Sequence, residues 1–239
     1  MEVFAYSVLL QWRRNLRNKN VLLVYYLIPL GFWAFMGAIF SSVNPLVKEQ
    51  LTQVLTVIAV STGALLGVPV SLSESYTGDI KKAYIAGNIK LWIGVASNFI
   101  SAFLHLSIVC IIIYLLTPLT FQAGKTPGLN VYIPALILFM AASIAVGCVI
   151  GLYVKDQGKV TIYSQIVYMP SLMMSGAMFD AAMLPKVLEA AGKLFPATWG
   201  FLAMKSTELS IRYLAPLILI LVISFLLMLV RLIRMTKET

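Results

Sequence analysis

Few side chains in this 239-residue chain have the type and spacing that catalysis needs. The tripeptide Gly124-Lys125-Thr126 has the residue order that ends a nucleotide-binding P-loop. That motif also needs a glycine where this chain has Leu119, and a β-strand before it. We therefore predict that the chain binds no nucleotide and hydrolyses no ATP by itself.

The residues that could hold a metal ion or relay a proton are equally sparse. His105 is the only histidine, and Cys110 and Cys148 are the only cysteines. A zinc site would need a second histidine or a carboxylate in the same apolar surroundings, so we predict no metal site and read the cysteines as small apolar residues. His105 could relay protons in a secondary transporter, but no carboxylate lies in any apolar stretch to receive one. A hydrogen bond within a helix bundle is the preferred interpretation.

The composition places these residues in a membrane protein. Hydrophobic residues make up 60% of the chain and charged residues 11%, and the mean hydropathy is +0.92. Soluble domains carry about 25% charged residues. The net charge of +9 comes from cations grouped beside apolar stretches, which is typical of membrane orientation signals and not of nucleic-acid binding.

Six apolar stretches organise the chain, and all charged residues fall outside them. Each is close to the roughly 20 residues that a helix needs to cross a bilayer, and none alternates with a period of two. The sequence therefore predicts an all-α integral membrane protein with six transmembrane helices, in which residues 1–20 precede a permease domain at 21–239. The predicted spans are Val21–Phe40, Leu51–Ser73, Trp92–Leu116, Val131–Val154, Val160–Phe179 and Tyr213–Val230.

The distribution of lysine and arginine predicts the orientation. Of the 18 cations, twelve lie on the side of the membrane that holds both termini. The positive-inside rule then places both termini in the cytoplasm of a multi-pass protein of the plasma membrane.

Residues 2–20 have the pattern of an amphipathic helix in the cytoplasmic interface, although a simple basic flank would also carry these charges. Apolar side chains recur every fourth residue and the arginines take other faces; they are Phe4, Val8, Trp12 and Leu16 against Arg13, Arg14 and Arg17.

The loop after the second span, residues 74–90, is longer than a connection requires. Gly78 permits a turn, and a short helix after it would place Ile80 and Tyr84 on one side, with Glu74 and Lys81 around them. We interpret this loop as a docking element for a soluble partner; the alternative is an ordinary polar loop.

Residues 180–207 are predicted to form two short amphipathic helices on the outer face that re-enter the bilayer edge. Pro185 and Pro196 would each open one of them, because proline is tolerated in a first helical turn.

Two rows of polar and small side chains run along the second and fifth spans. They predict either a hydroxyl-rich route for an amphiphilic substrate or plain helix packing. The route residues are Gln53 and Thr56 in the second span and Thr161, Gln165, Tyr168, Ser171 and Ser175 in the fifth, flanked by Met174 and Met178. Two further pairs, Gly63/Gly67 and Gly147/Gly151, would let helices approach closely within one subunit or between two.

Taken together, these features resemble a type-2 ATP-binding-cassette (ABC) transporter permease of the drug and antibiotic export branch. The resemblance rests on the N-terminal helix, the six spans, the loop Glu74…Gly78…Lys81 and the series Pro170…Ser175-Gly176…Phe179…Leu184-Pro185…Phe195-Pro196. Asp180, Tyr76 and Thr77 depart from the family pattern.

The resemblance implies a division of labour between subunits. The loop at 74–86 would be the coupling helix that fits a groove on a cytoplasmic ABC ATPase, which would bind ATP and Mg²⁺, and this chain would need no cofactor. Two copies, or this chain and a sister permease, would export an amphiphilic small molecule, drug or peptide. The alternatives are an ATP-independent carrier or channel, for which His105 is the single ionisable side chain within the spans, and a membrane scaffold.

Overall fold

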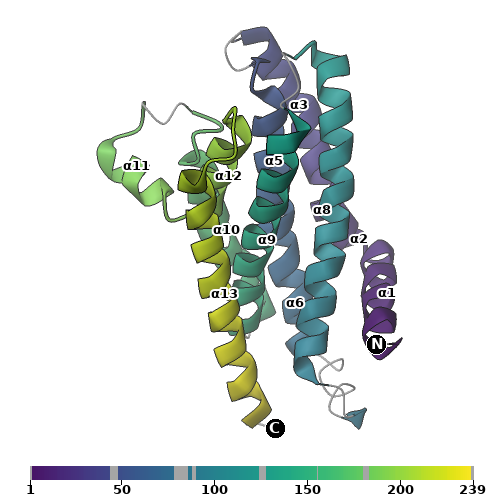
Figure 1. Cartoon of the computed structure of the whole chain (residues 1–239). Coiled ribbons are helices and arrows are strands. Elements are labelled where there is room, and N and C mark those ends of the chain that lie inside the picture. Colours follow the sequence, from purple (N-terminus) through teal and green to yellow (C-terminus); the bar gives the residue numbers. More distant parts are fainter. Residues whose placement is uncertain are drawn as a thin grey trace.

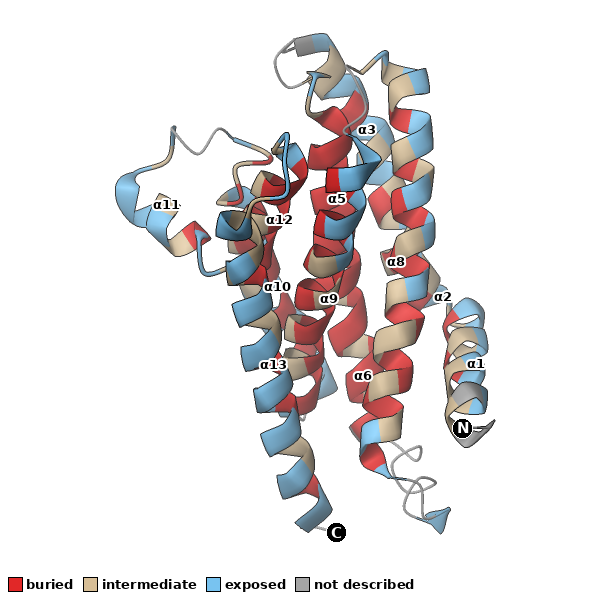
Figure 2. Cartoon of the chain, in the orientation of Figure 1, coloured by how far each residue is buried: buried red, intermediate tan, exposed pale blue. Residues whose placement is uncertain are grey.

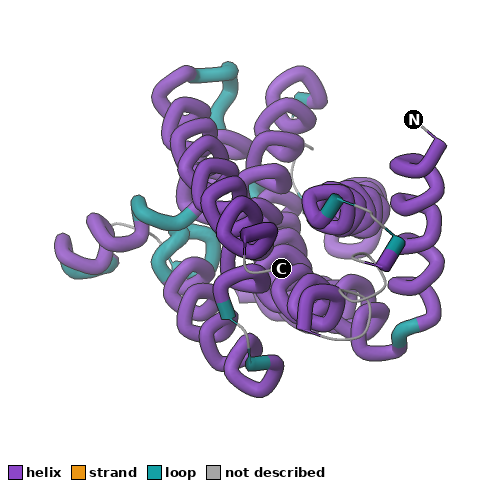
Figure 3. The backbone as a smooth tube through the Cα atoms, turned by 90° about the horizontal axis from the view of Figure 1, so that it is seen from below, coloured by secondary structure: helices purple, strands orange, loops and turns teal. Residues whose placement is uncertain are grey.

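The computed structural model describes residues 2–43, 48–77, 86–87, 90–123, 128–154, 156–179 and 183–237. Within these ranges the chain is helical, with no strand (Figures 1 and 3). The helices are α1 Glu2–Arg17, α2 Lys19–Leu22, α3 Ile28–Val43, α5 Leu51–Thr62, α6 Val68–Thr77, α8 Leu91–Phe121, α9 Leu129–Tyr153, α10 Gln157–Met173, α11 Lys186–Gly192, α12 Pro196–Lys205 and α13 Ile211–Lys237, with π-helical turns η1 Leu23–Leu27 and η2 Gly63–Gly67.

Five helices in the described ranges are long and apolar enough to cross a membrane. They correspond to the first, second, third, fourth and sixth predicted spans, which confirms an all-helical, multi-pass architecture. They are Lys19–Ser42, Leu51–Tyr76, Leu91–Phe121, Leu129–Tyr153 and Ile211–Lys237.

The predicted fifth span, Val160–Phe179, is only partly correct. Its helix, α10, has 17 residues and ends at Met173, a length of about 26 Å at 1.5 Å per residue. Turns and bends follow up to Phe179. Pro170 supplies no backbone donor near the helix end, and Gly176 has a φ of 83°, a left-handed conformation that continues no helix.

The second span is the centre of the bundle. Every residue of α5 is buried, and Figure 2 shows the buried positions concentrated on α5, α6 and the helices around them. By contrast, only 17% of the residues in an apolar 18-residue stretch of the first span are buried, and the same share is buried in the last span. The centre is therefore held by helix–helix packing, and the outer helices present apolar side chains to their surroundings.

Both small-residue pairs make contacts within this chain. A Cβ atom added at Gly147 of α9 would lie 2.1 Å from the backbone oxygen of Ala64. Added at Gly63 or Gly67, it would lie 3.2 Å from the ring of Tyr25 in η1. The glycines thus allow α9 and the first span to approach the second span, which decides between the two readings of these pairs.

Helix α1 packs beside the bundle through two polar side chains and through part of its predicted apolar row. In the view along the bundle axis, α1 is seen lengthwise near the terminus marked N, whereas the long helices are foreshortened (Figure 3). Among its described side chains, Gln11 and Asn15 are buried, and Leu16 is 42% exposed. Trp12 stacks on the ring of His105, with 4.0 Å between centroids. The predicted apolar row is therefore divided, because Trp12 contacts the bundle and Leu16 does not, and polar side chains on α6 and α8 also bind this helix.

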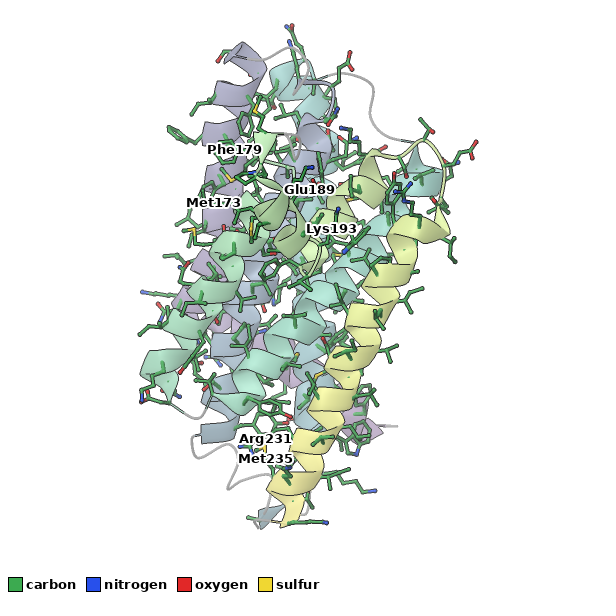
Figure 4. The ribbon with its side chains drawn as sticks, turned by 90° about the vertical axis from the view of Figure 1, so that its left-hand side faces the viewer. Met173, Phe179, Glu189, Lys193, Arg231 and Met235 are labelled. Carbon is green, nitrogen blue, oxygen red and sulfur yellow. The ribbon has the colours of Figure 1, made fainter. Side chains whose placement is uncertain are left out.

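Two short helices, α11 and α12, follow α10, as predicted for residues 180–207. Pro196 stands in the first turn of α12, which packs on α9 and α13, while α11 lies away from the bundle (Figure 1). Thr198 Oγ1 donates to the backbone oxygen of Gly192 at 2.6 Å and ties the two helices together. On α11 a hydrogen bond from Lys193 at 2.8 Å lowers the pKa of the exposed Glu189 carboxyl (Figure 4).

Candidate functional site: the α10 face and the lower end of the bundle

The sequence predicts one polar face on the fifth span, but the polar side chains of α10 lie on two different faces. Ser164, Tyr168 and Ser171 are buried within the chain, whereas Thr161 and Gln165 are exposed. The predicted stripe therefore divides into a packing face and an outward face.

On the packing face, Tyr168 hydrogen bonds to the central helix, whereas the buried hydroxyls of Ser164 and Ser171 have no hydrogen-bond partner in the described part of the chain. Tyr168 and Thr62 of α5 share a hydrogen bond of 3.0 Å. Thr56, a predicted route residue, is likewise paired with Tyr132 of α9 at 2.6 Å. Gln53 is 6% exposed, and its side-chain oxygen has no hydrogen-bond partner in the described part of the chain. These groups hold the bundle together and face no open space in the isolated chain.

Ser175 has a separate structural task in the turn after α10. Its hydroxyl donates to the backbone oxygen of Leu172 at 2.7 Å and accepts from the backbone N–H of Ala177 at 3.1 Å. Met174 and Met178 are half-buried beside this turn. The serine thus closes the chain reversal that ends the helix.

The outward face of α10 is a row with a spacing of four residues. Thr161 and Gln165 continue into Met169 and Met173, which are 51% and 49% exposed; Met173 lies at the upper end of α10 (Figure 4). We call these four residues the α10 row. Met169 was missed from the sequence, although its spacing from Gln165 places it on the same helix face.

A second, narrower row is left open on the second span. Leu66, Val70 and Glu74 are half-buried, again four residues apart, in a helix that is otherwise almost entirely buried. Helix α6 continues beyond Glu74 to Thr77, so this carboxylate lies inside the last helical turn, before the predicted docking helix.

The two helices that flank the predicted docking loop are connected by a hydrogen bond. The hydroxyl of Tyr76, at the end of α6, donates to the backbone oxygen of Leu91, at the start of α8. Gly78, Ile80, Lys81 and Tyr84 lie outside the described residues, as do Gly124-Lys125-Thr126 and Asp180.

Above this loop, a cluster of polar side chains fastens α1 to α6 and α8. Asn15 donates to Ser101 at 3.0 Å, Gln11 donates to Ser71 at 3.4 Å, and Asn98 donates to the same serine at 2.9 Å. Arg14 adds a 2.6 Å bond to Ser75 Oγ. We call this the α1 clamp; the polar spacing of Gln11 and Asn15 was the signal in the sequence that could have found it.

His105 forms a hydrogen bond within the bundle, as we predicted from the sequence. Its Nδ1 lies 2.7 Å from the hydroxyl of Tyr26, and its ring stacks between Trp12 and Tyr25. No cluster of metal-ligating side chains occurs in the described ranges, and Cys110 and Cys148 are buried and unbridged.

The apolar bundle defines a multi-pass membrane protein. Several of its buried polar side chains form hydrogen bonds between helices. The sequence pattern of the ABC-2 type transporter family matches residues 3–209, and the chain belongs to this family. It is thus the membrane-spanning permease component of an ABC transporter. Comparison with curated proteins found no match.

Proposed function

We propose that this chain is the permease subunit of an ATP-driven exporter in the plasma membrane, acting on an amphiphilic small molecule, drug or peptide. The observation that carries the proposal is membership of the ABC-2 type transporter family over residues 3–209. In this proposal α10 is a sixth, short span, both termini are cytoplasmic, α1 lies in the cytoplasmic interface, and α11 and α12 meet the bilayer from outside.

The α10 row is proposed to face a second permease copy and to line the substrate route there. An amide such as Gln165 is poorly accommodated by hydrocarbon and is normally turned toward protein or water. The same row carries Met169 and Met173 on its outer half, and flexible thioether side chains adapt to apolar ligands of different shape. A polar inner half and an adaptable apolar outer half fit an amphiphilic substrate moving outward.

The open row on the second span supports the same location. Helix α10 packs against α5, η2 and α6, and Leu66 and Val70 of the second span are half-buried. The buried residues Gln53, Thr56, Tyr168, Ser171 and Ser175 are proposed to shape the route from behind, and not to touch substrate in this conformation.

Coupling to the ATPase is proposed at the loop that starts near Glu74 and includes Gly78, Ile80, Lys81 and Tyr84. The bond between Tyr76 and Leu91 and the α1 clamp fix the helices at both ends of this loop. A force applied to the loop by a moving ATPase would therefore reach α6, α8 and α1 together.

Copurification tests the subunit assignment. A tagged full chain expressed with candidate ABC ATPases from the same genome should retain one of them, and the chain alone should hydrolyse no ATP. Replacing Tyr84 with Asp should release the ATPase from a permease that is still inserted in the membrane. The control is Leu209→Asp, in the connection between α12 and α13, which should retain the ATPase. ATP-independent transport by a chain that retains no ATPase would instead favour the secondary carrier.

A further inference from the structure

We propose that the groove between the lower halves of α8 and α13 binds one acyl chain of an anionic phospholipid in the leaflet that faces the cytoplasm. The groove has a volume of about 330 Å³. Its lining side chains are all apolar: Trp92, Val95, Ala96, Phe99 and Ile100 from α8, and Phe225, Met228, Leu229 and Leu232 from α13.

The length of the groove matches the depth of one leaflet. On α8 it extends from Trp92 to Ile100, about 12 Å at 1.5 Å per residue. One leaflet contributes about half of a hydrocarbon core that is roughly 30 Å thick. An acyl chain lying along the helices would therefore fill the groove over most of its length.

Aromatic side chains mark the two ends of the groove. Toward its inner end, the rings of Phe99 and Phe225 approach with 5.9 Å between centroids. At its outer end, Trp92 is 50% exposed and contacts Phe4 of α1, at 6.2 Å between ring centroids. A half-exposed tryptophan is typical of the depth of lipid headgroups.

The charges at the open end favour an anionic headgroup. Lys90, Arg234 and Lys237 are exposed within a few residues of the groove's lower end, and neither α8 nor α13 contains an acidic residue. Arg231, labelled on α13 in Figure 4, has partners away from the groove. Its Nε donates to the backbone oxygen of Leu152 at 3.1 Å, and its guanidinium lies over the ring of Tyr153. Basic side chains beside an apolar groove at the cytoplasmic end of helices are how proteins hold anionic lipids.

A bound lipid also explains how α13 can stand apart from α8 here. The two helices make little direct contact, while α13 packs extensively on α9. An acyl chain would replace the missing side-chain contacts along this part of α8. The groove is distinct from the α10 row, so the proposal does not depend on the substrate route; the choice of leaflet rests on the proposed orientation.

Lipid retention by the full chain tests this proposal. The chain is purified in mild detergent from membranes that contain phosphatidylglycerol and phosphatidylethanolamine, and retained lipid is measured by native mass spectrometry. We expect a retained phosphatidylglycerol, lost in Ala96→Trp, which fills the groove, and kept in Leu104→Trp, an exposed position elsewhere on α8. A double variant, Arg234→Gln with Lys237→Gln, should keep a lipid but lose the preference for phosphatidylglycerol.

Three results would overturn the proposal. Retention of the same lipid by Ala96→Trp would place it elsewhere on the surface. Retention of both lipids in their membrane proportion would show a general lipid belt. Disulfide crosslinking of Leu229→Cys between two copies, in a chain lacking Cys110 and Cys148, would make the groove a contact between permeases. Thermal stability of each variant in detergent separates these outcomes from misfolding.

Discussion

Gly147 shows how closely the bundle depends on single atoms. The missing side chain lets α9 approach the backbone of the second span at Ala64. Gly31, on the exposed side of α3, has no atom within 4 Å of the position of an added Cβ. Both glycines lie within apolar helices, and they differ in the neighbouring atoms that an added Cβ would meet.

Gly147→Ala should therefore destabilise the protein, by about 1–3 kcal/mol for an overpacked contact, while Gly31→Ala should leave stability unchanged or raise it slightly, because alanine is the better helix former. Thermal unfolding of both variants in detergent measures the difference. Equal stability would mean that α9 and the second span are farther apart than the structure places them.

The Tyr168–Thr62 hydrogen bond gives a second prediction for single residues. Tyr168→Phe and Thr62→Val should each cost little, since hydrogen bonds between membrane helices contribute about 0.6 kcal/mol on average. In a double-mutant cycle the two changes should couple by that amount, and transport should persist. If instead Tyr168→Phe abolished transport at unchanged stability, this hydroxyl would belong to the substrate route after all.

Among the elements, α1 is the one whose role the sequence predicts least well. Its arginines and its row of apolar side chains indicate an interfacial helix, yet its buried contacts with the bundle are made by Gln11 and Asn15. The α1 clamp places these residues beside α6, a turn above Glu74. Helix α1 thus shares its anchor with the helix that leads into the docking loop.

Asn15→Ala should loosen α1 by about 1 kcal/mol, the typical value of a hydrogen bond, and should lower ATP-driven transport more than ATP hydrolysis by the assembled complex. Leu16→Ala, at an exposed neighbouring position, is the matched control. Hydrolysis and transport that fall in parallel, or not at all, would show that the clamp has no part in coupling.

The sequence predicts elements better than it predicts their faces. Apolar length alone identifies five spans, because crossing a bilayer is a requirement of the segment itself. The end of α10 at Met173 depends on Pro170 and on the left-handed Gly176, which a hydropathy window averages away. The faces of α1 and α10 depend on partners far along the chain, such as Ser101 for Asn15 and Thr62 for Tyr168, and no local pattern contains them.

For the molecule as a whole, the proposed function makes the described bundle one of two permease copies. Its central helix α5 is buried along its whole length, whereas the α10 row is exposed and carries the polar side chains Thr161 and Gln165. Cysteines at Thr161 or Gln165, in a chain lacking Cys110 and Cys148, should crosslink between two copies or react with a thiol reagent in a substrate-protected way. A cysteine at the buried Ser171 should stay unreactive. Unreactive cysteines at both exposed positions in a transporting protein would move the route away from α10.

The energy source of transport tests the central claim most directly. The permease and its ABC ATPase are reconstituted in vesicles, and uptake of a fluorescent amphiphile is followed with ATP on the ATPase side. We predict uptake that requires ATP and the ATPase and that is lost when the ATPase cannot hydrolyse ATP. Uptake by the permease alone, driven by a proton or sodium gradient, would contradict the assignment as an ATP-driven exporter.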